Sequence, residues 1–397
     1  MRRLPNRLAS IARRKCRWTL PLIAVAAAGC SDASVEGDPE TSAAAAYQQR
    51  IEEVPRRPVA PDLSAEERAL DDAVFTTANV FEGYVGIAIR DIERGRVIHF
   101  NGERMFPQQS LSKLWVALAA LEKVDEGELD LAEKVSIRRS DLTVFHQPVR
   151  KIVLARGAFH TDYGDLLRRA ITESDNTAND MLLRRVGGPP GVRNAIAAGD
   201  LGAIKFGPGE RAMQSALAGL EWDPSYSIGK RFFEVRKTVP AAQREIAFNG
   251  YVNDPVDGAS PNAIAAALAR LAQGDLLEPP TTDLFLRLLD AVKSGPNRLK
   301  GGVPEGWSIG HKTGTGQVLD TVPPGVIGEQ AGYNDVGILT APDGHRYAVV
   351  VMIGRTATPV PERMELMHRI VAATVAYHYQ AKGEAVPPAM LPPIEES

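Results

Sequence analysis

The chain has 397 residues, 44% of them hydrophobic and 24% charged, which is usual for a soluble protein of one large or two ordinary domains. Residues 1–29 hold seven basic side chains and no acidic ones; because the whole chain has 46 basic and 49 acidic residues, the rest has 39 against 49, a formal net charge of −10. That charge argues against a nucleic-acid partner, which requires a basic surface. The only cysteines, Cys16 and Cys30, lie near the N-terminus, so the body of the chain has neither a cysteine nucleophile nor an internal disulfide.

The N-terminal segment has the features of an export signal. Residues 1–30 combine a basic start, the short apolar run TLPLIAVAAA and small residues before Cys30. The sequence AAGC at 27–30 resembles a bacterial lipoprotein cleavage box, which predicts lipid attachment to Cys30; the alternative is plain secretion. Residues 31–65 are rich in Ala, Ser, Pro and charge, which predicts a flexible tether. We therefore expect an exported, periplasmic protein whose only membrane contact is a lipid anchor at Cys30.

The body of the chain opens with a helix signal and a hairpin signal. Ser64 and Glu67 have the spacing of a capping box at the start of a helix. Alternating apolar residues over 84–91 and 97–100 predict two strands joined as a hairpin. From about Ser110 the sequence is apolar on nearly all sides of a helix, so this helix should be buried.

The rest of the chain predicts a helical middle and a strand-rich C-terminal part. Residues 207–260 lack a regular period and contain Gly, Pro and aromatic residues, which predicts a long surface loop. Helices are predicted over 163–186, 261–294 and 361–379, and strands over 307–314, 334–341 and 345–354.

This order of elements predicts the α/β (α+β) class. A five-stranded antiparallel sheet, built from both parts of the chain and flanked by terminal helices, should carry an all-helical insert domain. The predicted sheet domain comprises residues 66–130 and 265–385. The predicted helical domain comprises residues 131–264, with an extended loop at about 205–260.

A serine and a lysine at a predicted helix start are the first catalytic candidates. Ser110 and Lys113 lie three residues apart, so their side chains share one face of the helix. A lysine whose pKa is lowered by burial can act as a base for a serine hydroxyl, which is a weak nucleophile without one. The alternative is a capping serine beside a solvated lysine.

Two further motifs lie at other predicted element boundaries. The SDN triplet at 174–176 offers a second hydroxyl and an amide, although taken alone it favours an ordinary N-cap. The KTGT segment at 312–315 ends a predicted strand, along which a substrate can align by main-chain hydrogen bonds. The alternative is a charged edge-strand lysine that prevents aggregation.

Together and in this order, the motifs resemble the S-x-x-K, S-D-N and K-T-G set of penicillin-interacting serine hydrolases, and of the class A β-lactamases in particular. The resemblance extends over about residues 75–380. It implies that Ser110 is the acylated nucleophile and that Lys113 is a base for it. It also implies that Ser174 and Lys312 form the proton route to the leaving nitrogen of the substrate.

The resemblance also implies the residues that bind the substrate. The backbone N–H groups of Ser110 and Thr315 would form the oxyanion hole, and Phe145 would be the aromatic wall of the cleft. Asn176 would hold the substrate amide, and Thr313 with Thr315 its carboxylate. The implied substrate-binding set is Asn176, Thr313, Gly314, Thr315, Phe145 and Gln214.

A lactamase must also hydrolyse its acyl-enzyme, which requires a base that activates water. Counting from Ser174 without gaps, the glutamate that this family uses falls at Glu210, in the segment ERAMQ. Met213 keeps an apolar anchor, and Gln214 keeps an amide that can hold the water, although the family has the shorter Asn there. The alternative is a surface glutamate in a Gly-Pro loop.

Two departures from the family pattern leave the substrate preference open. The stretch from Glu210 to a predicted helix start at Ser260 is longer than in the family, and its aromatic residues either cover the cleft or pack the insert. The arginine that often binds the substrate carboxylate is absent from the strand at 334–341; Arg355 either replaces it or is a surface residue. The aromatic residues in question are Trp222, Tyr226, Phe232 and Phe233.

Three hypotheses follow for the function. The first is a monomeric periplasmic β-lactamase, the second a related peptidase that cleaves D-alanyl-D-alanine stems of peptidoglycan, and the third a non-catalytic sensor of either ligand. The partner is in each case a small molecule. No cofactor and no metal are expected, since no two histidines lie at i,i+2 or i,i+4.

Overall fold

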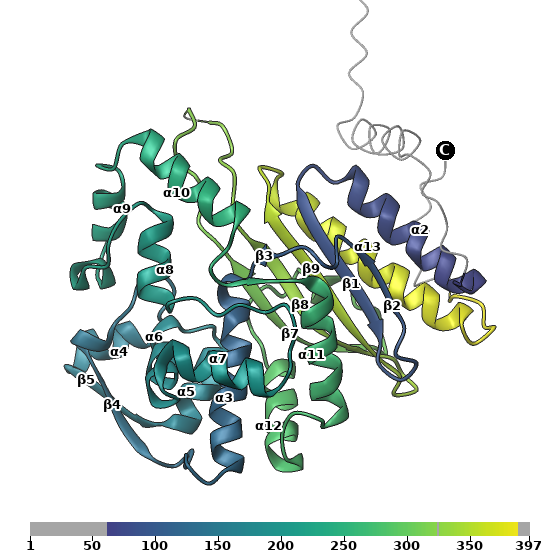
Figure 1. Cartoon of the computed structure of the whole chain (residues 1–397), viewed down its shortest axis with the longest axis horizontal. Helices are drawn as coiled ribbons and strands as arrows, with labels where there is room; N and C mark the ends of the chain where they lie inside the picture. The colour runs from purple at the N-terminus through teal and green to yellow at the C-terminus, as the bar shows by residue number, and fades with distance from the viewer. Residues whose placement is uncertain (1–61, 324, 388–397) are drawn as a thin grey trace, which may run out of the picture. The chain divides into compact units, whose positions relative to one another are not determined.

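The computed structural model describes residues 62–323 and 325–387 (Figure 1). The predicted export signal at residues 1–30, with Cys30, and the predicted tether as far as residue 61 lie outside these ranges. Within them, no helix combines the length and the apolar character that crossing a bilayer requires.

A five-stranded sheet lies at the centre of the fold, with the strand order β2-β1-β9-β8-β7. Every neighbouring pair is antiparallel, which confirms the predicted fold class. β9 is apolar along its length because its successive side chains alternate between two cores, one on each face of the sheet. The strands are β1 (Tyr84–Asp91), β2 (Val97–Phe100), β7 (Ser308–Thr315), β8 (Tyr333–Thr340) and β9 (Arg346–Arg355).

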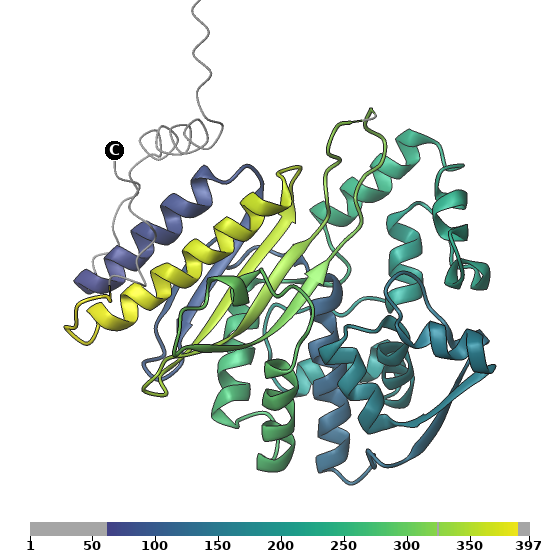
Figure 2. The same cartoon turned by 180° about the vertical axis from the view of Figure 1, so that it is seen from behind.

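Helices cover both faces of the sheet, as Figures 1 and 2 show. α2 (Ala65–Val80) and α13 (Val360–Gln380) pack together on one face, and the predicted capping box of Ser64 and Glu67 is formed at the start of α2. α11 and α12 lie on the other face, with α3 beside α12. These helices are α3 (Lys113–Asp125), α11 (Pro261–Gln273) and α12 (Pro279–Asp290).

The helical middle of the chain packs around α3, whose residues from Lys113 to Leu121 are all buried, as predicted. The predicted helical stretch at 163–186 forms two helices with a boundary at the SDN triplet, as predicted, because Ser174 has φ +56° and a helix cannot continue through that conformation. Sequence analysis did not anticipate the hairpin of β4 and β5, or α7. The elements of this part are β4 (Lys134–Arg138), α4 (Val149–Arg156), β5 (Ala158–Asp162), α5 (Tyr163–Thr172), α6 (Asn176–Arg185) and α7 (Gly188–Ala198).

Helices occupy much of the segment that was predicted to be an irregular loop at about 205–260, and this corrects the prediction. They are α8 (Glu210–Leu217), α9 (Arg231–Arg236) and α10 (Ala241–Asn253). α9 has only six residues, too few to show a helical period, and α10 has no side-chain cap at its N-terminus. The buried residues of α10 pack with α8 in a small core of their own, apart from the main cores.

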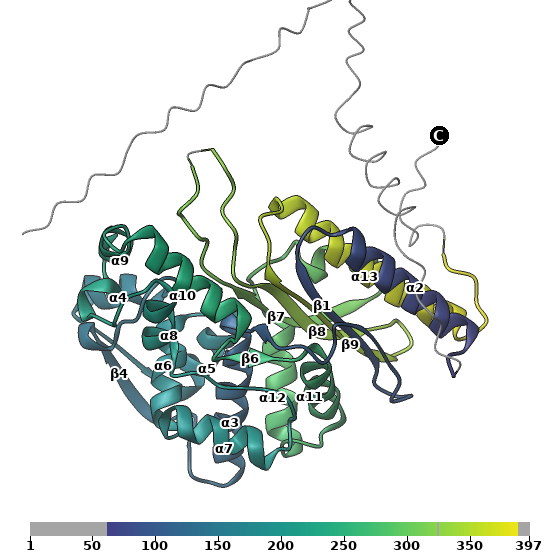
Figure 3. The same ribbon diagram turned by 45° about the horizontal axis from the view of Figure 1, so that its top comes forward.

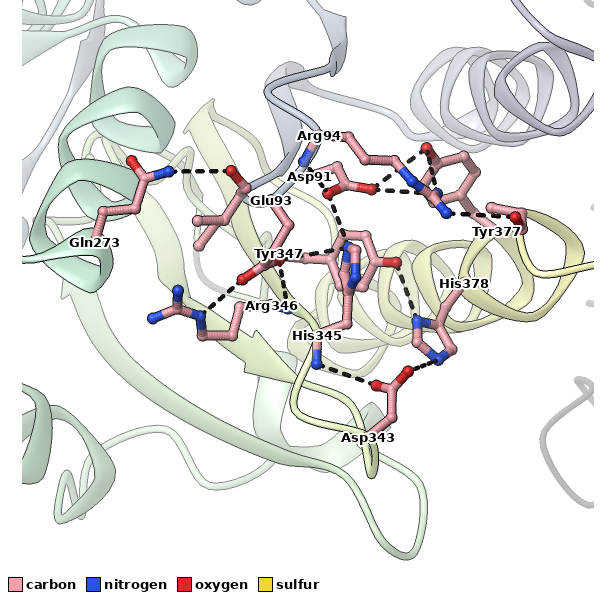
Figure 4. A network of polar contacts seen from close by, with 12 residues as sticks. Asp91, Glu93, Arg94, Gln273, Asp343, His345, Arg346, Tyr347, Tyr377 and His378 are labelled. Carbon is pink, nitrogen blue, oxygen red and sulfur yellow. Dashed lines mark hydrogen bonds and ion pairs between the residues drawn. The ribbon is translucent and has the colours of Figure 1, made fainter.

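A polar network fastens the end of β1 to the start of β9 (Figure 4). His345 Nε2 lies 2.8 Å from Asp91 Oδ1 and 3.4 Å from Glu93 Oε2. Arg94 pairs with Asp91 at 3.5 Å, and Arg346 pairs with Glu93 at 2.9 Å. Each carboxylate therefore has a cationic partner within the protein.

Candidate active site

The nucleophile candidate Ser110 lies in a short 3₁₀ turn that leads directly into α3. Gln109, the residue before it, has φ +55°, which is uncommon for a residue other than glycine. Asp257 Oδ2 accepts the backbone N–H of Gln109 at 2.8 Å, and Asn334 Nδ2 donates to the carbonyl of Pro107 at 2.7 Å. These buried contacts hold the turn in its strained conformation and leave Ser110 only partly buried.

Lys113, the first residue of α3, joins the serine motifs. Its Nζ lies 3.0 Å from Ser110 Oγ and 3.2 Å from Ser174 Oγ. It also donates to the Ser174 carbonyl at 2.9 Å and to Asn176 Oδ1 at 2.6 Å. The side chain is 1% exposed, so an ammonium group here has given up its water for these neutral oxygens.

Lys312, on β7, reaches the same serine from the other side. Its Nζ lies 3.0 Å from Ser174 Oγ and donates to the Thr313 carbonyl at 2.9 Å. A Cβ atom at Gly314 would lie 2.4 Å from the carbonyl oxygen of Gln108, so only glycine allows β7 to approach the nucleophile turn this closely. The three sequence motifs therefore meet in one continuous chain of side chains, from Ser110 through Lys113 and Ser174 to Lys312.

Burial shifts the pKa values of both lysines in the same direction. Burial lowers the pKa of Lys113, and the negative charges of Glu210 and Asp175 oppose this in part. Burial lowers the pKa of Lys312 well below its usual value, and the nearby positive charge of Lys113 adds to the effect. A neutral lysine next to a serine hydroxyl can take up its proton, which is the requirement for activating the serine.

Glu210, the first residue of α8, is 8% exposed and faces the same cluster. Its Oε1 accepts a hydrogen bond from Asn176 Nδ2 at 2.9 Å, while Asn176 Oδ1 accepts from Lys113. Burial raises the pKa of Glu210, against the opposing charge of Lys113 and a hydrogen bond from Gln214. The gap-free count thus led to a buried carboxylate within the cluster rather than to a surface glutamate.

An arginine that the sequence did not mark lies beside Thr315, at the end of the motif set that the family resemblance assigns to carboxylate binding. Arg298 Nη2 donates to Thr315 Oγ1 at 2.6 Å, and its Nη1 donates to the carbonyls of Gly314 and Asn334. Arg355, the arginine that sequence analysis considered, instead pairs with Glu329 and donates to Asn249 Oδ1 at 3.0 Å. Arg298 precedes β7 in a short irregular stretch, and no sequence pattern there marks it as a binding residue.

The remaining predicted binding residues lie around this cluster. Phe145 has φ +61° and follows Val144, whose carbonyl accepts from Asn176 Nδ2 at 2.9 Å. The Phe145 ring packs edge-on against Phe232 of the insert, with ring centroids 4.8 Å apart. Thr313 Oγ1 lies 2.7 Å from Ser294 Oγ. The long segment after α8 therefore contributes directly to the aromatic side of the site.

The fold and this cluster together define a serine hydrolase that works by acyl transfer, since a polarised hydroxyl, buried lysines and a buried carboxylate converge in one place. The model of the beta-lactamase enzyme family matches residues 67–379, and the chain belongs to this family.

Individual relatives agree with this assignment at low sequence identity. Beta-lactamase VEB-1 of Pseudomonas aeruginosa is 25% identical over 74% of this chain and 85% of its own length. The extended-spectrum beta-lactamase PER-1 of the same organism is 25% identical over 81% of this chain and 90% of its own. Among solved structures, a beta-lactamase from Chitinophaga pinensis is 25% identical, with a TM-score of 0.61, and covers 78% of this chain and 98% of its own.

Proposed function

We propose that the protein is a serine β-lactamase that opens the amide of β-lactam antibiotics through an acyl-enzyme on Ser110, and thereby confers resistance to them. The observation that carries the proposal is the 3.0 Å contact of Ser110 Oγ with the buried Lys113, next to the buried Glu210. Asn176 contacts both Lys113 and Glu210. One site thus supplies a base for acylation and a second base for hydrolysis.

Acylation uses the chain of serines and lysines. Neutral Lys113 accepts the hydroxyl proton of Ser110 while Oγ bonds to the lactam carbonyl carbon, and the backbone N–H groups of Ser110 and Thr315 hold the resulting oxyanion. As the C–N bond breaks, Ser174 gives its proton to the ring nitrogen and recovers one from the Lys113 ammonium, 3.2 Å away. Lys312, 3.0 Å from Ser174 Oγ, keeps this hydroxyl oriented.

Deacylation uses Glu210. The carboxylate takes a proton from a water molecule as the water oxygen attacks the acyl carbonyl carbon, and the proton returns to Ser110 Oγ when the ester bond breaks. Asn176 and Gln214, which hydrogen-bond to Glu210, favour its ionised form and fix its direction. A peptidase that penicillin traps has no need of this second base, so the buried Glu210 favours the lactamase over the peptidase.

Substrate recognition is assigned to the groups around this machinery. Thr313, Thr315 and the main chain at Gly314 bind the substrate carboxylate, with the charge supplied by Arg298 through its contact with Thr315. Asn176 also meets the side-chain amide of the substrate. We further assign export to residues 1–30 and a lipid anchor to Cys30, which would place the enzyme in the periplasm.

A mass measurement tests the proposed function. The full-length protein is mixed with benzylpenicillin and sampled from seconds to hours. Brief acylation followed by return to the free mass, together with a hydrolysed drug, is expected. A persistent adduct would instead establish the trapped peptidase, and the absence of an adduct together with an intact drug would establish the non-catalytic sensor.

A further inference from the structure

The helix α9 lies near α8 and α10 (Figure 3), and its side chains contact two different parts of the candidate site. At one side, Phe232 packs against Phe145. At the other side, Arg236 contacts the connection between β7 and β8, which follows Thr315. α9 belongs to the segment between α8 and residue 258, for which the three catalytic motifs give no role.

Arg236 makes several polar contacts between this segment and the β7–β8 connection. The side chain is 7% exposed, so its charge is satisfied by protein groups rather than by water. Its Nη1 donates to Gln317 Oε1 at 3.1 Å, and its Nη2 donates to the carbonyl of Val318 and lies 3.0 Å from Asp320 Oδ1. Arg244, on α10, pairs with the same Asp320.

Gln317 carries this contact on to the deacylation base. Its Nε2 donates to the carbonyl of Gln214 at 2.8 Å and to Gln214 Oε1 at 2.9 Å. Gln214 Nε2 in turn donates to Gln109 Oε1 at 2.8 Å. Gln214 follows Glu210 by four residues on α8, so the two side chains share one face of the helix, and the Gln214 side chain opposes the rise in the pKa of Glu210. A short line of polar contacts therefore runs from Arg236 through Gln317 and Gln214 to Glu210.

An apolar core supports the same connection. Side chains of α8 and α10 pack there with two residues of the β7–β8 connection, and this core is separate from the two large cores of the sheet. The helix α8, which begins with Glu210, is thus packed against both α10 and the β7–β8 connection. The members of this core are Met213, Leu217, Phe248, Tyr251, Val252, Leu319 and Ala331.

We propose that residues 218–257 are a brace for deacylation, in which Arg236 is a positioning residue that holds Gln214, and with it Glu210, through Gln317. A glutamine side chain has one more rotatable bond than the asparagine of the family pattern, so its amide needs partners on both ends to keep one orientation. Gln317 and Gln109 supply these partners. This inference rests on the proposed function, because it assigns the brace to one step of that reaction.

A defect in deacylation alone has a kinetic signature that a general loss of folded enzyme does not share. After irreversible acylation, kcat/KM reports formation of the acyl-enzyme, whereas a slower hydrolysis lowers kcat and KM by the same factor. A merely structural role for Arg236 would reduce the amount of active enzyme, which lowers kcat and leaves KM unchanged. The two roles are therefore separable in one titration of the substrate.

The test is steady-state hydrolysis of benzylpenicillin by the full chain and by Arg236→Ala. We expect kcat and KM to fall together by about 10- to 100-fold, because a displaced catalytic group costs up to about 100-fold. We also expect kcat/KM to stay within about twofold and the acyl-enzyme mass to accumulate. Arg231→Ala is the matched control, since Arg231 lies on the same helix, is exposed, and pairs only weakly with Glu234 at 4.0 Å; its kinetics should equal those of the wild type.

Two outcomes would overturn the brace. One is an unchanged kcat in Arg236→Ala, and the other is a fall in kcat with KM constant. If Arg236→Ala does not fold, as judged by circular dichroism, Gln317→Ala is tested instead. Gln317 lies between Arg236 and Gln214, so its removal must give the same joint fall in kcat and KM. Failure of the wild type to hydrolyse the drug would refute the proposed function instead, so the two failures are distinguishable.

Discussion

Two polar clusters lie at opposite ends of the sheet, and their charged groups have different kinds of partner. In the register of the sheet, Thr315 pairs with Tyr333 and through it with Ile353 at one end of β9, whereas Asp91 pairs with Tyr347 at the other end. Six residues of strand separate the two positions on β9, about 20 Å. The first end carries the candidate active site, and the second carries the network of Figure 4.

The clusters differ in the partners that they give to charged groups. Lys113 Nζ is held by neutral oxygens, and burial lowers its pKa. In the Figure 4 network the charged groups are paired with each other. In addition, the backbone N–H of His345 donates to the Asp343 carboxylate and lowers the pKa of Asp343 to about 2. In the first cluster burial outweighs the opposing charges and lowers the pKa values of both lysines, so that they can exchange protons with a hydroxyl group. In the second cluster, ion pairs favour the ionised forms and serve stability.

Removing the nucleophile should give the largest effect in the first cluster. Ser110→Ala leaves the buried lysine and glutamate in place but gives the lactam carbonyl no group to bond with. We expect β-lactam hydrolysis to fall by about 10⁴-fold or more and the covalent adduct to disappear from the mass spectrum. Ser112→Ala is the control, because this neighbouring hydroxyl donates to the Gln109 carbonyl at 2.8 Å and its removal should leave adduct formation intact.

Removing the second base should slow only the later half of the reaction. Glu210→Gln keeps the size and the hydrogen bond with Asn176 but cannot accept a proton from water. We expect kcat to fall by about 10²- to 10⁴-fold and the acyl-enzyme to persist. Glu221→Gln, at an exposed position of the insert, should have no effect; an equally rapid turnover in Glu210→Gln would assign the base to another residue.

The direction in which the pKa of Glu210 is displaced also gives a pH dependence. Because burial raises the pKa of Glu210, its ionised form is lost at a higher pH than that of an exposed glutamate. The rate of deacylation should therefore decline on acidification already above the usual glutamate range, while acyl-enzyme formation, which does not use Glu210, should not follow the same curve. Pre-steady-state measurements of the two rates between pH 7 and pH 4 check this, and coincident curves would contradict it.

The parts of the candidate site that depend on short spacings along the chain could be predicted from the sequence. Ser110 with Lys113, the SDN triplet and the KTGT segment are local patterns, and the position of Glu210 followed from counting along one of them. Arg298 could not be found in this way, because its place beside Thr315 depends on how β7 and β8 pair in space. The overall sheet was predictable because its strands are short apolar runs bounded by turn residues.

The structure of residues 218–257 could not be predicted from local sequence patterns. α10 buries its few apolar residues against α8 and the β7–β8 connection, and Phe232 of α9 packs against Val144 and Phe145. Most of these partners are distant in the sequence. Nothing in the local pattern of residues 218–257 indicates which surface they will meet. Their contact with Gln317, and hence with the site, is a tertiary property that only the folded chain reveals.

Removing the arginine should give a moderate effect, confined to substrate binding. Arg298→Ala deletes the charge beside Thr315, so the substrate carboxylate loses a charge-assisted partner worth about 1.5–3 kcal/mol, and KM should rise about 10- to 100-fold with a smaller change in kcat. Arg355→Ala is the matched comparison, since Arg355 is engaged with Glu329. An equal rise of KM in both variants would contradict the assignment to Arg298.

The smallest predicted effect concerns the second cluster, where a change in pH should alter the free energy of unfolding rather than the activity. His378, at the end of α13, is buried and hydrogen-bonds to Tyr347 at 3.1 Å, and burial lowers its pKa. The unfolded chain therefore takes up this proton at a higher pH than the folded one. As the pH falls through the usual histidine range, the free energy of unfolding should decrease, with a slope of at most about 1.4 kcal/mol per pH unit for one proton.

Urea unfolding at pH 8 and pH 5.5 measures this effect, and the interval stays above the range in which Asp343 titrates. The wild type should lose more stability between the two pH values than His378→Gln, which keeps a polar side chain beside Tyr347 but cannot be protonated. His160→Gln, at an exposed position, should behave as the wild type. An equal loss of stability in the wild type and in His378→Gln would contradict the prediction, because protonation of His378 would then not contribute to the pH dependence of unfolding.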